Sequence, residues 1–169
     1  MKRLELEGLI QSAQACRLMA LTAVRTKELR LMRWTDIDGD LLRIPKDRMK
    51  KELDLLVPLS RQAIEIIENL RARSNSEYLF PNARRLDRPM SENAVLYLIG
   101  RMGYGKEMTG HGWRTAMSTW ANEAGFNADA IERQLAHVPG DKIRGIYNRA
   151  EYLSERRRML QAWADWLIP

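Results

Sequence analysis

Two residues that favour water or a charged partner lie at the start of a segment that otherwise predicts a buried helix. In the stretch HGWR, His111 and Arg114 accompany Trp113, and Met117 and Trp120 follow as candidates for a core. Residues i and i+3 of a helix share a face, so this imidazole and guanidinium can converge on one phosphate. Without further motifs, a histidine cap and an arginine whose stem covers the helix explain the pair equally well.

The titratable residues make a poor metal site. The chain has two histidines and one cysteine, no His-x-x-x-His pair, and Glu28 as the only carboxylate within the candidate motifs. These observations disfavour a metal-dependent nuclease. A phosphodiester is also attacked without metal when arginines hold its non-bridging oxygens, a hydroxyl is aligned in line and a cation protonates the leaving oxygen. We therefore expect no metal and no other cofactor.

Length and composition set the remaining bounds. A chain of 169 residues is most simply one domain with its own core. The lone Cys16 excludes an internal disulfide framework, and the absence of an apolar run of about 18 residues disfavours membrane insertion and export. The net charge of +6 and the pI near 9.7 favour a polyanionic partner, with nucleic acid ahead of an acidic membrane surface.

The elements that must position these residues are mostly helical. Apolar periodicity and end signals predict helices over about 4–24, 27–33, 60–73, 91 onward, 111–124, 128–136, 140–149 and 151–167. Ser60 and Ser91 are the expected N-caps. Two short strands are expected, one within 37–45 after the Asp38-Gly39 turn signal and one within 53–60, around the basic tip KDRMKKE. The predicted fold class is mainly α with a small antiparallel β-sheet (α+β).

The last helix has one apolar stripe. Its residues Leu153, Leu160, Trp163 and Leu167 lie on that stripe, whereas the three arginines at 156–158 are predicted to keep most of their charge outside it. Such a helix packs on its own domain or docks on a neighbouring subunit.

Five segments, in order, resemble the tyrosine recombinases, in particular the phage and prophage integrases. They are LTAVRTKELRLMRWTDID (21–38), RMKKELDLLVPLS (48–60), HGWRTAMSTWANEAG (111–125), IERQLAHVPGDKIRGIYNRAEY (131–152) and ERRRMLQAWADWL (155–167). Each motif alone is weak evidence for the family. Together, the five motifs occur in the family's order and cover nearly the whole chain, and a tyrosine lies ten residues after the second histidine. The resemblance implies the tyrosine recombinase catalytic-domain fold.

The resemblance assigns roles to the first two motifs. Arg25 in VRTKEL is the implied first phosphate-binding arginine, and Glu28 orients it from the next turn. Taken alone, RTKE reads as a solvated ion pair. Lys50 at the predicted hairpin tip matches the family's general acid toward the departing 5′ oxygen. Lys51 is a rival, and Lys50 is preferred because RMK followed by VPLS has the family spacing.

The later motifs complete the implied catalytic set. Arg114 is the second phosphate-binding arginine, and His111 assists proton transfer at the attacking tyrosine. His137 resembles the position that hydrogen-bonds the scissile phosphate, although the helix dipole alone favours a histidine there. Tyr147 is the implied nucleophile, which forms a 3′-phosphotyrosyl intermediate and releases a 5′ hydroxyl. Tyr152 lacks the ten-residue spacing from His137.

The sequence departs from the family pattern in two ways. Ala23 and Ala136 occupy positions where the family often has glycine, and Trp113 is bulkier than the frequent leucine. No catalytic group is lost, so we expect the chain to be catalytically competent. The larger expected departure concerns the N-terminal DNA-clamping and arm-binding domains of the family, which we expect to be absent. We expect residues 1–169 to form a single catalytic domain, in a truncated protein, a gene fragment or a solitary domain.

The implied function is site-specific recombination of double-stranded DNA, that is, integration or excision of phage, prophage or other mobile DNA. The expected assembly is a homo-tetramer on DNA, joined through the C-terminal helix and monomeric when free, in the cytoplasm of a bacterial host cell. Two alternatives stay open: a basic helical module that binds DNA or a partner integrase without cutting, and a type IB topoisomerase. The apolar final helix beyond Tyr147 favours exchange between protomers over the topoisomerase.

Overall fold

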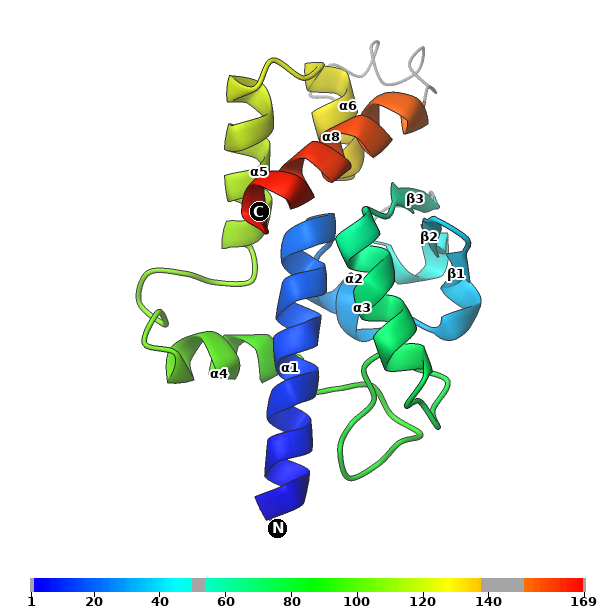
Figure 1. Ribbon diagram of the computed structural model, residues 1–169, viewed down its shortest axis with the longest axis vertical. Helices are drawn as coiled ribbons and strands as arrows, with labels where there is room; N and C mark the ends of the chain where they lie inside the picture. The colour runs from blue at the N-terminus through cyan, green and yellow to red at the C-terminus, as the bar shows by residue number, and fades with distance from the viewer. Residues whose placement is uncertain (1, 50–53, 138–150, 169) are drawn as a thin grey trace.

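The chain forms a mainly helical fold with a small antiparallel sheet, as the sequence predicts. The computed structural model describes residues 2–49, 54–137 and 151–168 (Figure 1). The helices are α1 (Lys2–Thr22), α2 (Thr26–Arg30), α3 (Arg61–Arg71), α4 (Ala94–Arg101), α5 (Gly112–Glu123), α6 (Ala128–Gln134) and α8 (Leu153–Leu167). The strands are β1 (Ile37–Asp38), β2 (Leu41–Ile44) and β3 (Leu55–Pro58). The helix expected over 140–149 lies outside the described residues.

The long helix α1 is the axis of the fold. In Figure 1 the sheet, α2 and α3 lie on one side of α1, and α4 lies on the other. Helices α5, α6 and α8 gather at the C-terminal end of α1 and contact one another there. The motifs at 21–28, 111–114 and 131–137, far apart in the sequence, are therefore carried to one end of the molecule.

The sheet contains three strands in the order β1-β2-β3. Asp38 pairs with Leu41, so the first hairpin turns through two residues, and Gly39 adopts the positive φ of 57° that such a turn requires. The segment 37–45 thus forms two strands rather than the single strand expected. Strands β2 and β3 pair from Leu41–Pro58 to Ile44–Leu55. The expected basic tip lies between them, and its residues 50–52 are outside the described part of the chain.

Helix ends follow local chemistry in most places. The Ser60 hydroxyl accepts a hydrogen bond from the Ala63 amide at 3.3 Å, which confirms the predicted cap of α3. The prediction for α4 was wrong by two residues, because its N-cap is Asn93 and the Ser91 carbonyl accepts from the Ala94 amide in the preceding turn. Helix α2 also ends at Arg30, earlier than the expected Arg33.

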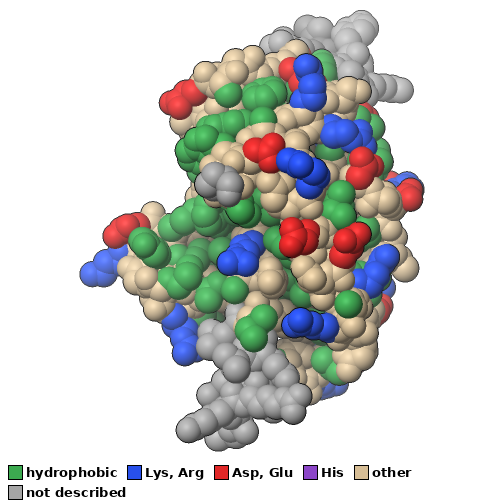
Figure 2. Space-filling model, viewed as in Figure 1, with side chains coloured by type: hydrophobic (Ala, Val, Ile, Leu, Met, Phe, Trp, Pro, Cys, Tyr) green, Lys and Arg blue, Asp and Glu red, His purple; other side chains and the backbone are tan. Residues whose placement is uncertain are grey.

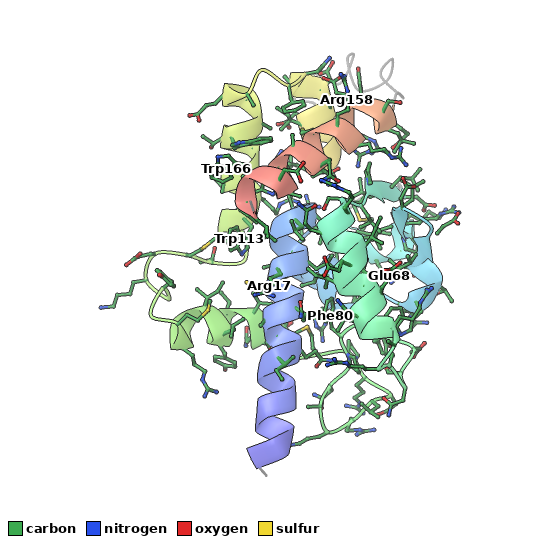
Figure 3. The ribbon with its side chains drawn as sticks, in the orientation of Figure 1. Arg17, Glu68, Phe80, Trp113, Arg158 and Trp166 are labelled. Atoms are coloured by element: carbon green, nitrogen blue, oxygen red, sulfur yellow. The ribbon has the colours of Figure 1, made fainter. Side chains whose placement is uncertain are left out.

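Two buried clusters hold these elements together. The larger one joins α1 to the sheet, α3 and α4. The smaller one joins the end of α1 to α5, α6 and α8, and consists of Ala23, Met117, Ala121, Ile131, Leu135, Met159 and Trp163. Figure 3 shows Trp113 of α5 beside α1.

The surface in Figure 2 intermixes acidic with basic side chains, and hydrophobic side chains gather over α4 and α5. That face carries no broad basic patch.

Helix α8 packs on its own chain, but not as the sequence predicted. Met159, Leu160 and Trp163 are buried, and Trp166 is exposed. The expectation that all three arginines keep their charge outside is wrong for Arg156, which is 0% exposed, whereas Arg157 pairs with Asp40 at the surface. The reason is that α8 crosses both α6 and β3, which cover the Arg156 side of the helix. In the described ranges, no helix is long and apolar enough to cross a membrane.

Candidate active site

The first candidate arginine, Arg25, is fixed at the start of α2. It occupies the N-cap in an extended conformation, with φ −74° and ψ 152°. Glu28, which is 3% exposed, accepts one hydrogen bond from the Arg25 amide and one from its Nη1, each at 2.8 Å. A residue at N3 that reaches back to the N-cap amide stabilises the first turn of a helix. The expected Arg25–Glu28 pair is therefore present, and it leaves Arg25 Nη2 directed elsewhere.

The second candidate arginine, Arg114, is buried in α5. It is 2% exposed, and its Nη1 and Nη2 donate to the carbonyl oxygens of Ala23 and Leu135, each at 2.6 Å. Its Nε has no hydrogen-bond partner among the described residues. Burial, and to a lesser extent the nearby charge of Arg25, lowers the pKa of Arg114 to about 10, although Glu28 and Glu132 act in the opposite direction. Arg114 stays protonated at neutral pH.

His137 lies against Arg114. Its Nε2 is 3.4 Å from Arg114 Nη2, and its Nδ1 is 3.0 Å from a carboxylate oxygen of Glu132. Because a guanidinium only donates, Nε2 accepts in this contact, so the proton of the neutral ring lies on Nδ1 and is donated to Glu132. Glu132 thereby orients the ring, as a carboxylate does for a histidine in many catalytic and metal sites.

Both arginines meet at the end of α6. Arg25 Nη2 lies 3.4 Å from the Leu135 carbonyl and 3.5 Å from the Ala136 carbonyl, and Arg114 donates to the same Leu135 oxygen. The structure therefore brings together Arg25, Arg114 and His137 from three separate motifs. Two guanidinium groups this close repel each other, and a phosphate that bridges them would relieve that repulsion while accepting several charged hydrogen bonds.

The two alanines that depart from the family's glycine pattern shape this corner. Ala23 and Ala136 have φ values of 53° and 47°, in the left-handed region that glycine adopts without strain. Ala23 follows α1, and its carbonyl accepts from Arg114; Ala136 follows α6 and lies one residue before His137. The two alanines that replace the family's frequent glycines therefore lie at the two left-handed backbone positions beside the arginines.

His111 occupies a different environment from Arg114. It is the exposed N-cap of α5, and within the described part of the chain its ring makes no hydrogen bond. Arg114 lies one turn later and points inward. The convergence of the two side chains on one phosphate stays a prediction.

The remaining two candidates, Lys50 and Tyr147, lie outside the described residues, as does the rival Lys51. The rival tyrosine is described: Tyr152 is the N-cap of α8, and its hydroxyl is 3.5 Å from a carboxylate oxygen of Asp129. In the ranges 2–49, 54–137 and 151–168, no group of three or more histidine, cysteine, aspartate or glutamate residues is arranged to hold a metal ion.

Two residues that support the site, Glu132 and Gln134, are not among those predicted from the sequence. Glu132 precedes His137 by five positions, a spacing with no recognised signature, and only the turn that ends α6 brings them together. Gln134 is 0% exposed and donates to the Thr22 carbonyl at 2.8 Å. A buried glutamine in an apolar segment was the available signal, because a buried amide requires partners.

The fold is the tyrosine recombinase catalytic-domain fold. The structure resembles the integrase from mycobacterium phage Brujita, with a TM-score of 0.68 and 16% identity over 94% of this chain and 55% of that one. It also resembles a lambda integrase (75–356) dimer bound to a COC′ core site, with a TM-score of 0.59 and 16% identity over 84% of this chain and 53% of that one. A lambda integrase tetramer bound to a Holliday junction matches with a TM-score of 0.59 and 17% identity, over 83% of this chain and 42% of that one.

The chain belongs to the phage integrase family. Residues 6–153 match the model described as the phage integrase family. The prophage integrase IntZ of Escherichia coli (strain K12) is 47% identical over 97% of this chain and 41% of its own length. The integrase of Shigella phage Sf6 is 44% identical over 95% of this chain and 43% of its own. The chain thus spans less than half the length of these relatives.

Proposed function

We propose that this chain is the strand-cleaving part of a site-specific DNA recombinase that integrates or excises phage or other mobile DNA. The observation that carries the proposal is the meeting of Arg25, Arg114 and His137 at the end of α6, in a member of the phage integrase family. The reaction would take place in the bacterial cytoplasm, where host and phage DNA are both present.

In the proposed reaction, Arg25 and Arg114 bind the non-bridging oxygens of the scissile phosphate. The unpartnered Nε of Arg114 supplies a donor that a phosphate oxygen would satisfy. His137 adds a third contact from its Nε2 side, once that nitrogen carries a proton. The two fixed guanidinium charges stabilise the extra negative charge of the pentavalent phosphorane, and we propose that they do so without a metal ion.

The remaining groups, of which Lys50 and Tyr147 lie outside the described residues, complete the step. The Tyr147 oxygen attacks phosphorus and forms a 3′-phosphotyrosyl bond while the bond from phosphorus to the 5′ oxygen breaks. His111 accepts the proton from the tyrosine, and Lys50 donates a proton to the departing 5′ oxygen. The reverse sequence rejoins a strand, and no cofactor is needed because the covalent bond retains the phosphodiester energy. Tyr152 is the weaker candidate nucleophile, because its hydroxyl already lies near Asp129.

The proposed partners are double-stranded DNA and further copies of this chain. The lambda integrase structures named above are a dimer on a core site and a tetramer on a Holliday junction, which supports a tetramer on DNA. We propose that α8 contributes to the contact between protomers. Its last turn exposes Trp166 and Ile168, which are 62% and 42% accessible although the helix packs on its own chain. Large exposed apolar side chains favour a protein contact.

The test is covalent capture of DNA. The chain is incubated with supercoiled plasmid at low salt in the presence of a chelator, and both relaxation and protein-linked DNA are scored. Tyr147→Phe should abolish both, and Tyr152→Phe should retain both, because only the former removes the proposed nucleophile. Adducts that persist in Tyr147→Phe, or that require a divalent metal, contradict the proposal.

The same assay separates the alternatives. Salt-sensitive DNA binding without adducts supports a basic binding module. Relaxation by a strictly monomeric protein on DNA supports a topoisomerase instead of a recombinase.

A further inference from the structure

A buried polar pair outside the candidate site links α8 to it. Arg156 of α8 and Gln134 of α6 are both 0% exposed. Arg156 donates to Gln134 Oε1 from Nε at 3.0 Å and from Nη2 at 2.9 Å. Arg156 also donates to the carbonyl of Glu151 at 3.0 Å and to the carbonyl of Leu56 on β3. One side chain therefore ties α8 to α6, to β3 and to the chain just before α8.

The chemistry of this pair fixes which way the Gln134 amide points. An arginine has donors and no acceptor, so the atom of Gln134 that faces Arg156 must be the oxygen. The amide nitrogen then points away from Arg156, and it donates to the carbonyl of Thr22 at the end of α1 at 2.8 Å. Arg156 thus determines the hydrogen bond that ties α6 to α1.

This tie lies one residue away from both acceptors of Arg114. Gln134 holds the Thr22 carbonyl, and the next carbonyl, that of Ala23, accepts from Arg114 Nη1. Likewise, the carbonyl that follows Gln134, that of Leu135, accepts from Arg114 Nη2. The Gln134–Thr22 bond therefore sets the separation of the two backbone segments between which the Arg114 guanidinium is held.

A second branch reaches toward the proposed nucleophile along the chain. Arg133 donates to both carboxylate oxygens of Glu151, and Arg156 Nη1 lies 3.6 Å from the same carboxylate. Glu151 follows Tyr147 by four residues, and four residues span at most about 14 Å. The contacts of Glu151 with Arg133 and Arg156 therefore fix the described residue that is nearest in sequence after Tyr147.

We propose that Arg156 and Gln134 are positioning residues. They hold in one arrangement the carbonyl groups of Ala23 and Leu135, which accept from Arg114, and the carboxylate of Glu151. The inference rests on the proposed function of Arg114 and Tyr147. Arg156 itself contacts neither Arg25 nor Arg114 through any hydrogen bond among the described residues, so it acts through Gln134 and Glu151. Its charge persists at neutral pH, since burial, and to a lesser extent Arg133, lowers its pKa only to about 10.

The decisive variant is Gln134→Glu. A carboxylate still accepts from Arg156, so α8 stays anchored, but it cannot donate to the Thr22 carbonyl and repels that oxygen. We expect single-turnover cleavage of a nicked DNA substrate, at saturating protein, to be slower by about tenfold to 100-fold. DNA affinity and the fraction of folded protein should stay the same within error. A loss of cleavage that matches the unfolded fraction contradicts the proposal.

A second measurement does not depend on cleavage. The side-chain NMR signals of Arg114 in ¹⁵N-labelled protein can be assigned with Arg114→Lys. They should shift or broaden in Gln134→Glu, because the carbonyl groups of Ala23 and Leu135 that accept from Arg114 move. Unchanged Arg114 signals overturn the proposal. If the wild-type chain forms no adduct at all, the proposed function fails, and these signals still decide whether Gln134 positions Arg114.

Two further variants separate the branches and control for charge. Glu151→Gln, at a partly exposed position, should slow cleavage and leave the Arg114 signals unchanged, since it affects only the branch toward Tyr147. Arg157→Gln removes the neighbouring arginine, which pairs with Asp40 at the surface, and should change neither readout. Equal effects of Arg157→Gln and Glu151→Gln would contradict the role given to Glu151.

Discussion

Arg114 and Arg156 are two buried arginines with similar burial and different surroundings. Both are at most 2% exposed, and burial lowers the pKa of each to about 10. Arg156 donates from all three of its nitrogens to an amide oxygen and two carbonyls and also pairs with Glu151. Arg114 donates to two carbonyls, leaves Nε without a partner, and forms no ion pair with a carboxylate within the described ranges.

The difference is the one expected between a structural cation, Arg156, and the proposed phosphate-binding cation, Arg114. A buried charge is stable when hydrogen bonds and an opposite charge replace its lost hydration, and Arg156 meets that condition within the protein. Arg114 does not, and the largest effect of a neighbouring charge on its pKa comes from the like charge of Arg25, which lowers it. In the proposed reaction, the scissile phosphate would supply both the missing counterion and the missing acceptor. Incomplete pairing, more than burial, therefore distinguishes the candidate phosphate site.

The largest expected effect is on stability, at Arg156. Arg156→Met leaves Gln134, Leu56 and Glu151 without their buried donor, so the free energy of unfolding should fall by about 3–5 kcal/mol. Denaturant unfolding at neutral pH measures this loss. Arg157→Met, which removes an exposed partner of Asp40, should change stability by no more than about 0.5 kcal/mol. Similar losses in the free energy of unfolding for the two variants would show that the buried contacts of Arg156 stabilise the protein no more than the surface pair of Arg157 does.

Arg114→Met should show the opposite pattern. Removing a cation that is repelled by Arg25 should leave stability within about 1 kcal/mol of the wild type, since hydrogen bonds to Ala23 and Leu135 are lost while that repulsion is relieved. The rate of adduct formation should fall about 100-fold to 1,000-fold, the effect of losing one fixed donor to a developing negative charge. Retained cleavage in a folded Arg114→Met protein would refute its assignment.

Phosphate should stabilise the protein through the same site. At a concentration ten times its dissociation constant, an anion that binds only the folded state adds about 1.4 kcal/mol to the free energy of unfolding. Thermal unfolding in phosphate, compared with chloride at equal ionic strength, measures this gain. Arg114→Met should abolish it and Arg157→Met should keep it. An equal gain in both variants would place the anion elsewhere.

The smallest effects are expected at the left-handed alanines. Ala136→Gly relieves a strained φ of 47° at a half-buried position and should stabilise the protein by up to about 1 kcal/mol. Ala23→Gly relieves similar strain but removes a fully buried methyl group, so its effect should be close to zero. Melting temperatures of the two variants test the contrast. A lower melting temperature for Ala136→Gly than for the wild type would contradict it.

Local sequence predicted the parts of the molecule that depend on local chemistry. The Asp38-Gly39 turn and the Ser60 cap each involve residues a few positions apart, and each is present. The Arg25–Glu28 pair is also present, but RTKE taken alone predicted a solvated pair, whereas Glu28 is buried. The meeting of Arg25, Arg114 and His137 was implied by the family resemblance alone, since no local signal relates the three motifs. The placements of Lys50 and Tyr147 stay predictions.

The burial of Arg156 was predictable from helical periodicity but not from composition. Three consecutive arginines look equally solvated, yet Arg156 lies three residues after Leu153 and four before Leu160, on the apolar stripe itself. Successive residues of a helix differ by about 100° in direction, so Arg157 and Arg158 leave that stripe. The position was therefore readable, but its partners on α6 and β3 depend on tertiary packing and were not.

The two oxygens that hold Arg114 belong to the backbone at Ala23 and Leu135. No substitution removes a main-chain carbonyl, so these acceptors persist through any side-chain change that leaves the path of the backbone unaltered. The location of the cation is therefore inherited through the trajectory of the backbone more than through the identity of neighbouring residues. Divergent descendants of such a domain could lose nearly all resemblance around the arginine and still present it at the same point.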